Sequence, residues 1–244
     1  MYKFLATALM VFTCLFAHPA SADAISITIE NDGWILKGDR YDAAGDAPRA
    51  VALLFHNAGG NRTEYAAFAG ELARNSITSI AVDLRGHGES TNLDTFDWKV
   101  RKNFEINVEA WKDIVAAMSY VDSDPTLSLL PLIFVGASYS GEKMVEAATR
   151  YRMPNMMIEF SPGSFSDTSI AQIDPSGIPW LFVRAEKELP FFDALFEAIR
   201  AGSDNAEIWI VPGKGHGTRI LDTRPRLLGR IVSWINEKLK TIKE

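Results

Sequence analysis

The sequence LLPLIFVGASYSGEK, residues 129–143, decides the fold because it joins an apolar run to a turn that carries a serine. The run at 129–135 is typical of a strand that is buried on both faces of a parallel sheet. The segment after Ser138 is typical of a helix, and the residues around Ser138 are small. A serine at such a strand-to-helix turn exposes a nucleophilic hydroxyl, so hydrolysis by acyl transfer is the leading hypothesis. A helix that is merely capped by Ser138 is the alternative interpretation.

Strand-like and helix-like segments alternate along most of the remaining chain. An antiparallel hairpin is predicted at 24–41, with the turn Asn31-Asp32-Gly33 between its strands. Further strands are predicted at 50–55, 77–83, 131–137, 155–160, 178–184 and 207–212, and helices at 63–75, 102–121, 140–150, 190–201 and 221–240. This order predicts one α/β domain at 23–244, with a mostly parallel, doubly wound sheet of about eight strands. Only residues 161–177 separate two of the later strands, which is too short a segment for a lid domain.

Residues 1–22 have the features of a secretory signal peptide of bacterial type. Lys3 precedes an apolar stretch at 4–17, which is shorter than the roughly 20 residues that span a bilayer, and Ala-Ser-Ala at 20–22 is typical of a cleavage site. We therefore expect cleavage after this motif and a periplasmic or secreted mature protein, with an uncleaved membrane anchor as the alternative. Cys14, the single cysteine, lies inside the signal, so the mature protein is expected to have no disulfide and no cysteine metal site.

Composition and charge exclude several classes of partner. The chain is 47% apolar and 23% charged, which is ordinary for a globular protein, and its formal net charge is −6. Loss of Lys3 with the signal makes the charge −7, since 24 basic residues then face 31 acidic ones. An acidic protein is a poor ligand for nucleic acid and for anionic lipid, and no later segment approaches the length of a membrane span. These features leave the oligomeric state open.

Residues capable of chemistry follow the predicted strands in five separate loops. In open sheets of this class, ligands bind beyond the carboxyl ends of the strands. The loops contain the motifs HNAGGN at 56–61, DLRGHGES at 83–90, GASYSG at 136–141, RAEKE at 184–188 and PGKGHG at 212–217. We therefore expect all five loops to meet at one edge of the sheet.

These motifs occur in the order and spacing of the α/β-hydrolase fold. The chain resembles exported members of that superfamily that are similar to dienelactone hydrolases and serine esterases, and the resemblance covers nearly all of the residues after the signal. GASYSG resembles the nucleophile elbow G-x-S-x-G, with Ser140 in place of the second glycine. The resemblance implies that Ser138 is the nucleophile.

A serine hydroxyl requires a base within hydrogen-bond reach, and histidine is the expected one. Of the four histidines, His18 lies in the signal, and the resemblance implies supporting roles for His56 and His87. His216 follows the last predicted strand and matches the chain order Ser, acid, His of this fold. We therefore expect His216 to be the base, and a surface histidine in a glycine-rich loop is the alternative.

The acid of the predicted triad orients the histidine and stabilises its charged form. The resemblance implies an Asp in a G-x-x-D pattern after the penultimate strand, where this chain has Ala185 at the glycine position and Glu188 at the acid position. Glu186 and Asp193 are rival candidates. The alternative interpretation is that all three carboxylates are solvated charges at the start of a helix, where the helix dipole stabilises negative charge.

Two backbone N–H groups are needed to stabilise the oxyanion. The resemblance implies that Tyr139 and Ala58 supply them. Asn57 stands where the family has glycine, and this change is tolerable because Asn adopts positive φ more readily than most residues. The alternative interpretation of HNAGGN is a plain glycine-rich turn. The motif is not a phosphate loop, because it lacks the glycine spacing and the Lys of that motif.

Two further features flank these motifs. Asp83 and Arg85 are expected to lock loops together rather than to contact substrate. Phe96 and Trp98 lie in an otherwise polar stretch, where they are candidates for an acyl pocket or for simple packing of the loop.

The sequence as a whole predicts a secreted serine hydrolase that cleaves a small or exposed carboxylic ester. No metal ion and no organic cofactor is implied by its motifs. A peptidase or a thioesterase with the same triad is one alternative. A catalytically inactive binding protein of the same fold is the other, because Ser140, Asn57 and Glu188 depart from the family pattern.

Overall fold

The computed structural model describes residues 23–242 with short gaps, which are 46, 98, 100–102, 164, 174–176, 192–195, 198, 201–203 and 223. The predicted signal at 1–22 lies outside the described residues. So do Trp98 and Asp193, together with much of the helix predicted at 190–201.

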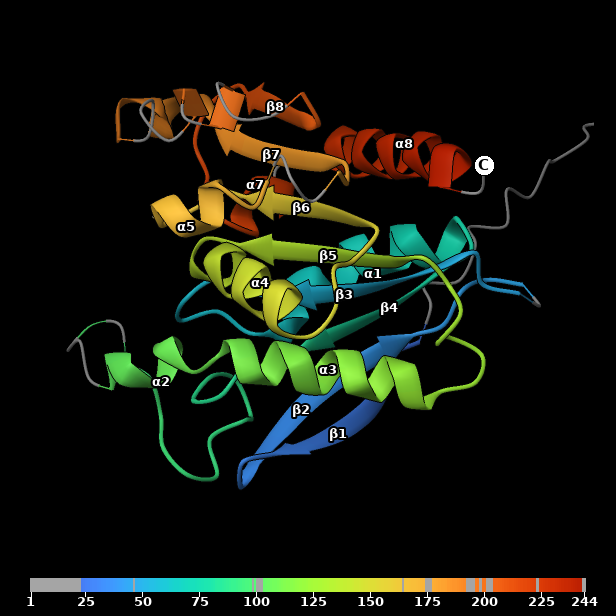
Figure 1. Ribbon diagram of the computed structural model, residues 1–244, viewed down its shortest axis with the longest axis vertical. Helices are drawn as coiled ribbons and strands as arrows, with labels where there is room; N and C mark the ends of the chain where they lie inside the picture. Colours follow the sequence, from blue (N-terminus) through green and yellow to red (C-terminus); the bar gives the residue numbers. More distant parts are fainter. Residues whose placement is uncertain are drawn as a thin grey trace, which may run out of the picture.

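Eight strands of the described chain form one mixed sheet in the order β1-β2-β4-β3-β5-β6-β7-β8 (Figure 1). They are β1 (Ile25–Asn31), β2 (Trp34–Tyr41), β3 (Ala50–Phe55), β4 (Ile77–Val82), β5 (Leu132–Ala137), β6 (Met156–Phe160), β7 (Trp180–Ala185) and β8 (Ala206–Val211). β2 pairs antiparallel with β1 and β4, and all other neighbours are parallel. The predicted fold class is therefore confirmed.

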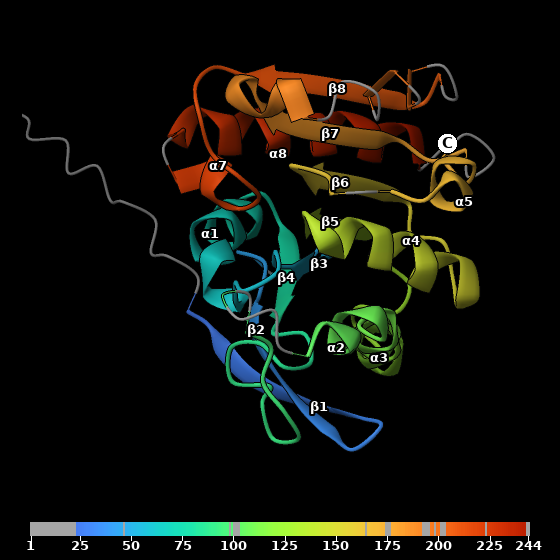
Figure 2. The same cartoon turned by 90° about the vertical axis from the view of Figure 1, so that its left-hand side faces the viewer.

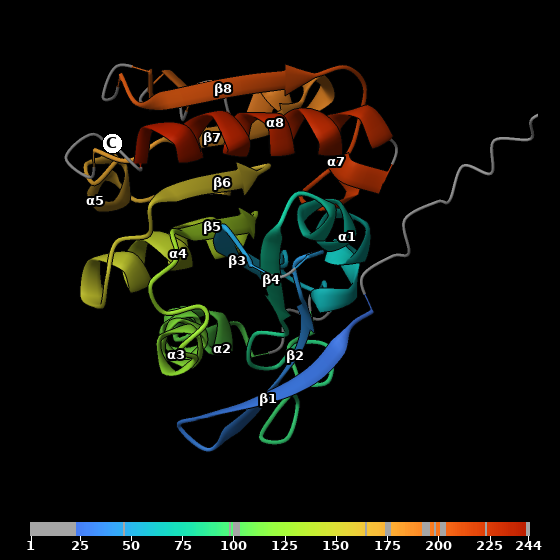
Figure 3. The same ribbon diagram turned by 90° about the vertical axis from the view of Figure 1, so that its right-hand side faces the viewer.

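Helices cover both faces of the sheet (Figures 1–3). α3 (Trp111–Ser123) and α4 (Tyr139–Arg150) pack on one face, whereas α1 (Ala66–Arg74) and α8 (Pro225–Ile242) pack on the other. The apolar residues of β3 contribute to the hydrophobic cores on both faces of the sheet, because successive side chains of a strand point to opposite faces. Leu53 belongs to the core beneath α3 and α4, and its neighbour Leu54 belongs to the core beneath α1 and α8.

Two predicted helices are each divided in the structure. The helix predicted at 102–121 is α2 (Phe104–Val108) followed by α3, and the helix predicted at 221–240 is α7 (Arg219–Asp222) followed by α8. Pro225 begins α8 because proline has no N–H to donate and its φ suits the first helical position. The chain after β7 forms the 3-10 helix η2 (Glu186–Phe191), and another short one, η1 (Arg62–Tyr65), precedes α1.

The connection between β6 and β7 is short. Among its described residues the only helix is α5 (Asp167–Ile170), so no lid domain covers the carboxyl edge of the sheet at this point. No helix in the described part of the chain is both long enough and apolar enough to cross a bilayer.

Candidate active site

Ser138 lies on the turn between β5 and α4 with φ 58° and ψ −117°. A positive φ is uncommon for any residue except glycine, and such strain is found mostly at functional sites. Two glycines make this tight turn possible. A Cβ at Gly136 would lie 2.6 Å from Oε2 of Glu159, and a Cβ at Gly141 would lie 2.5 Å from its Cδ. Strand and helix therefore hold Ser138 at the carboxyl edge of the sheet.

Ser140, at the position of the missing glycine, fits without strain because it lies inside α4 and its φ is not positive. Its buried Oγ accepts a hydrogen bond from the N–H of Ala137 at 2.8 Å and lies 2.9 Å from the carbonyl oxygen of Phe55. Ser140, the residue that departs from the family motif, therefore connects the turn at Ser138 to β3.

His216 connects Ser138 to Glu188. Its Nε2 lies 3.0 Å from Oγ of Ser138, and its Nδ1 lies 2.6 Å from Oε1 of Glu188. The other carboxylate oxygen, Oε2, accepts a hydrogen bond from Oγ of Ser161 at 2.7 Å. The His216 side chain is 49% exposed and that of Glu188 is 15% exposed, so solvent reaches the imidazole much more readily than the carboxylate.

The carboxyl group of Glu188 is ionised at neutral pH. Burial raises its pKa, but hydrogen bonds from His216 and Ser161 favour the charged form and hold the pKa below its ordinary value. The carboxylate can therefore accept the hydrogen of Nδ1, which leaves Nε2 free to act as an acceptor.

Of the rival acids, Glu186 does not occupy this position, and Asp193 lies outside the described residues. The Glu186 side chain is exposed, and its carboxylate lies 3.4 Å from the N–H of Gly213. The N–H of Lys187 donates to the carbonyl oxygen of Gly213 at 3.0 Å, which attaches η2 to the loop that carries His216.

The loop after β3 differs from the expectation in one detail. Its positive φ falls on Gly59, at 75°, and not on Asn57. The Asn57 side chain lies against the loop that carries His216, where Oδ1 accepts a hydrogen bond from Oγ1 of Thr218 at 3.0 Å. The backbone N–H groups of Ala58 and Tyr139 make no hydrogen bond within the described ranges. That of Tyr139 belongs to the first turn of α4, whose N–H groups have no partner inside the helix.

His56 and His87 are buried beneath this loop. Nε2 of His56 accepts a hydrogen bond from the N–H of Leu84 at 3.1 Å, and Nδ1 lies 2.8 Å from the carbonyl oxygen of Asn57. Burial, with a smaller contribution from His87, lowers the pKa of His56 to about 3. A neutral His56 therefore links the loops after β3 and β4.

Asp83 and Arg85 are buried and lock loops, as expected. Asp83 accepts hydrogen bonds from the N–H groups of Arg62 and Glu89, at 2.6 and 2.9 Å. The guanidinium of Arg85 pairs with Asp113 of α3 at 2.6 Å.

A cavity of about 510 Å³ has Ala58, Ser138 and His216 in its wall. Four charged residues also line it, namely Glu64, Asp97, Lys99 and Arg219. Phe96 lines the cavity as well, and its ring is stacked on that of His87 with centroids 4.7 Å apart. This lining suits a small or polar substrate better than a long lipid chain. Within the ranges that the structure describes, no three His, Cys, Asp or Glu side chains are grouped so as to hold a metal ion.

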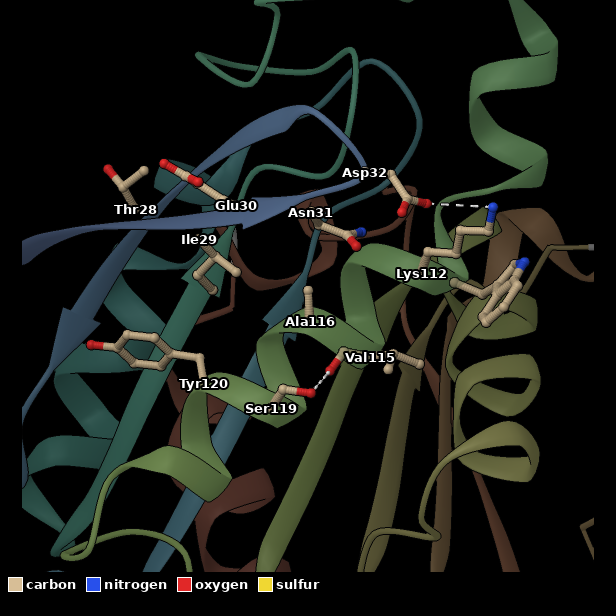
Figure 4. A pocket seen from close by; sticks show the side chains of 11 residues that line it. Thr28, Ile29, Glu30, Asn31, Asp32, Lys112, Val115, Ala116, Ser119 and Tyr120 are labelled. Carbon is tan, nitrogen blue, oxygen red and sulfur yellow. Dashed lines mark hydrogen bonds and ion pairs between the residues drawn. The ribbon is translucent and has the colours of Figure 1, made fainter.

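A larger hollow of about 700 Å³ lies away from this site, between β1 and α3 (Figure 4). Ile29 and Asn31 line it from the strand, and Val115 and Ser119 line it from the helix. None of the five predicted site residues contributes to its wall.

The sequence interpretation missed Ser161, which contacts Glu188 although no motif contains it. The signal was present, because Ser161 directly follows β6 and so meets the rule that active residues lie beyond the carboxyl ends of strands.

The chain is similar to a known protein family and to a characterised protein. The family model described as serine aminopeptidase, S33, matches residues 46–204. Protein phosphatase methylesterase 1 of Bos taurus is 30% identical over 121 residues, which are 48% of this chain and 28% of that protein. The aligned region is thus under one third of the methylesterase.

Solved structures show the same fold. Dienelactone hydrolase from Anabaena variabilis has a TM-score of 0.71 at 16% identity, with 91% of this chain and 99% of that chain covered. Est1E from Butyrivibrio proteoclasticus, in a complex with ferulic acid, has a TM-score of 0.69 at 16% identity, with 88% and 99% covered. XC6422 from Xanthomonas campestris, a serine hydrolase without a lid, has a TM-score of 0.66 at 18% identity, with 87% and 95% covered. The expected membership of the α/β-hydrolase superfamily is confirmed.

Proposed function

This chain belongs to the serine aminopeptidase S33 family of α/β-hydrolases, and from that premise we propose that it hydrolyses small or exposed carboxylic esters through an acyl-enzyme. Ser138 is the nucleophile, His216 moves the proton, and Glu188 orients His216. The observation that carries the proposal is the chain of contacts of 2.6 and 3.0 Å from Glu188 through His216 to Ser138. The ferulic acid bound to Est1E and the name of the methylesterase support esters as the substrate class.

The first half of the reaction transfers the acyl group to the enzyme. Oγ of Ser138 attacks the carbonyl carbon of the ester while Nε2 of His216 takes the hydroxyl proton. The N–H groups of Ala58 and Tyr139 stabilise the resulting oxyanion, and the Glu188 carboxylate stabilises the imidazolium. His216 then gives its proton to the alcohol oxygen, the bond between that oxygen and the acyl carbon breaks, and the alcohol leaves.

The second half returns the enzyme to its starting state. A water molecule attacks the acyl carbon and gives a proton to Nε2 of His216, which passes it to Oγ of Ser138 as the carboxylic acid leaves. The half-exposed imidazole gives water access to the acyl-enzyme, which favours hydrolysis over transfer to another alcohol.

Export is the other part of the proposal, and the signal-like residues 1–22 support it. N-terminal sequencing of the protein recovered from the periplasm and from the medium tests it. We expect the mature chain to begin at Asp23, and full-length protein confined to the cytoplasm would contradict export.

A peptidase with the same triad is the second candidate, because the matched family is described as serine aminopeptidases. The carboxylates of Glu64 and Asp97 line the cavity beside Ser138, where they suit the amino group of a peptide substrate. This candidate differs from the first in the leaving group, which is an amine and not an alcohol.

Both candidates are tested with the protein and its Ser138→Ala variant. Each is incubated with a fluorophosphonate probe, p-nitrophenyl butyrate, a butyryl thioester and an aminoacyl p-nitroanilide. We expect labelling and ester turnover that the variant lacks, with the ester cleaved faster than the anilide. Faster cleavage of the anilide would favour the peptidase. A wild-type protein that is inert towards all four reagents would favour the catalytically inactive binding protein.

A further inference from the structure

Ser161 lies directly after β6 in a conformation that L-residues other than glycine rarely adopt. It is fully buried and has a φ of 48°. Its N–H donates to the carbonyl oxygen of Val183 at 2.8 Å, which fixes the backbone at this point to β7. Strain of this kind persists only where the surrounding structure imposes it, and it is concentrated at functional sites.

The hydroxyl of Ser161 completes the environment of the Glu188 carboxylate. Oε1 of Glu188 contacts His216 at 2.6 Å, and Oε2 accepts the Ser161 hydroxyl at 2.7 Å. The last torsion of a Glu side chain is broad and has no sharp minimum of its own. A second hydrogen bond, from the opposite side, therefore fixes the plane of the carboxylate and the direction of Oε1.

The same segment also contacts the backbone of the nucleophile. The N–H of Ser138 donates to the carbonyl oxygen of Phe160 at 3.0 Å, and the N–H of Gly163 lies 3.3 Å from the carbonyl oxygen of Ser138. Residues 160–163 thus touch Ser138 through their backbone and Glu188 through a side chain. One short segment sets the position of both ends of the Ser138-His216-Glu188 contact chain.

We propose that Ser161 is a positioning residue, whose hydroxyl holds the Glu188 carboxylate in the orientation that keeps His216 against Ser138. This inference rests on the proposed function. It also explains how Glu serves where the family pattern has Asp. The longer side chain has one more rotatable bond, and Ser161 supplies the restraint that the extra bond requires.

The proposal is tested with Ser161→Gly, because glycine removes the hydroxyl and accepts the positive φ without strain. Ser166→Ala is the matched control, since Oγ of Ser166 donates to Oε1 of Glu142 at 2.8 Å, away from the site. With p-nitrophenyl butyrate, we expect Ser161→Gly to lower kcat about tenfold to a hundredfold, the range for a lost hydrogen bond to a charged group, with KM nearly unchanged. The control should retain wild-type kinetics.

A double-mutant cycle separates positioning from a merely structural role. If Ser161 acts through Glu188, Ser161→Gly should change kcat by less than about twofold in a Glu188→Gln background. An equal loss in both backgrounds would overturn the proposal, as would kinetics of Ser161→Gly that match those of Ser166→Ala. Urea unfolding of each variant verifies that the protein measured is folded.

A readout that does not depend on turnover distinguishes this proposal from the proposed function. The proton between Nδ1 of His216 and Glu188 should give a downfield ¹H NMR signal, which shifts or broadens in Ser161→Gly and is unchanged in Ser166→Ala. If the wild-type protein hydrolyses no ester but this NMR signal still shifts or broadens in Ser161→Gly, ester hydrolysis is refuted and the positioning role is supported. An unchanged signal in Ser161→Gly would refute the positioning role whatever the activity.

Discussion

Shortening Glu188 by one methylene should separate the acid from the histidine. A carbon–carbon bond is about 1.5 Å long. The contact of 2.6 Å with His216 and that of 2.7 Å with Ser161 should therefore each open to about 4 Å, beyond hydrogen-bond reach. The backbone is not free to compensate, because the N–H of Lys187 binds the carbonyl oxygen of Gly213 at 3.0 Å and fixes η2 to the histidine loop.

The expected magnitude follows from the two contacts that Glu188→Asp loses. Each hydrogen bond to a charged group contributes about 1.5 to 3 kcal/mol, and part of that total is recovered by solvation, so we expect kcat to fall about a hundredfold to a thousandfold. Glu188→Gln retains the length but loses the charge and favours the wrong tautomer of His216. Its kcat should fall by up to about ten-thousandfold, as for the corresponding change in chymotrypsin-like enzymes.

Steady-state hydrolysis of p-nitrophenyl butyrate measures both variants, with Glu186→Gln and Asp193→Asn as controls of matched chemistry. KM should stay near the wild-type value, because Glu188 acts on the reaction and not on substrate binding. A Glu188→Gln variant that retained more than about a tenth of the wild-type kcat would refute the assignment. A large loss of kcat in Asp193→Asn alone would assign the role of the acid to Asp193.

Three further outcomes are expected from the same structure. Gly141→Ala should lower the free energy of unfolding in urea by about 1 to 3 kcal/mol, because its Cβ would lie 2.5 Å from Cδ of Glu159. An unchanged urea midpoint would show that the turn can accommodate a methyl group at this position. Arg85→Met should lower the free energy of unfolding by about 3 to 5 kcal/mol in the same assay, because it removes the cationic partner of the buried Asp113 side chain. A loss under about 1 kcal/mol would contradict that role of the pair. The lowered pKa of Glu188 stabilises the fold above the unfolded value of about 4.3, and this contribution is lost as pH falls through the folded pKa. The urea midpoint of the wild type should therefore fall more steeply below pH about 4 than that of Glu188→Gln, and parallel curves would argue against the shift.

The strands could be predicted closely from the sequence because this sheet is covered on both faces. In β3 every residue is buried, so six consecutive apolar residues mark its two ends clearly. The ends of the helices do not follow as closely from the sequence, because apolar periodicity continues across the residues that separate two helices. α2 and α3 share one apolar pattern, yet Glu109 and Ala110 separate them in the structure.

The site residues that could be named in advance stand in motifs with unusual spacing, as Ser138 and His216 do. The partners of side chains on separate loops could not be predicted, even where, as for Ser161, the position directly after a strand indicates the edge of the sheet. Asn57 binds Thr218 across 161 positions of sequence, and Ser161 reaches Glu188 across 27. Neither pair follows from local propensity, because both depend on how the ends of parallel strands are juxtaposed.

Trapping of the acyl-enzyme tests the central claim most directly. The protein is mixed with p-nitrophenyl butyrate, quenched in acid during turnover, digested and analysed by mass spectrometry. We predict a butyryl group on the peptide that contains Ser138, and no such adduct in Ser138→Ala. Ester turnover that persists in Ser138→Ala, or an adduct confined to another residue, would contradict the account.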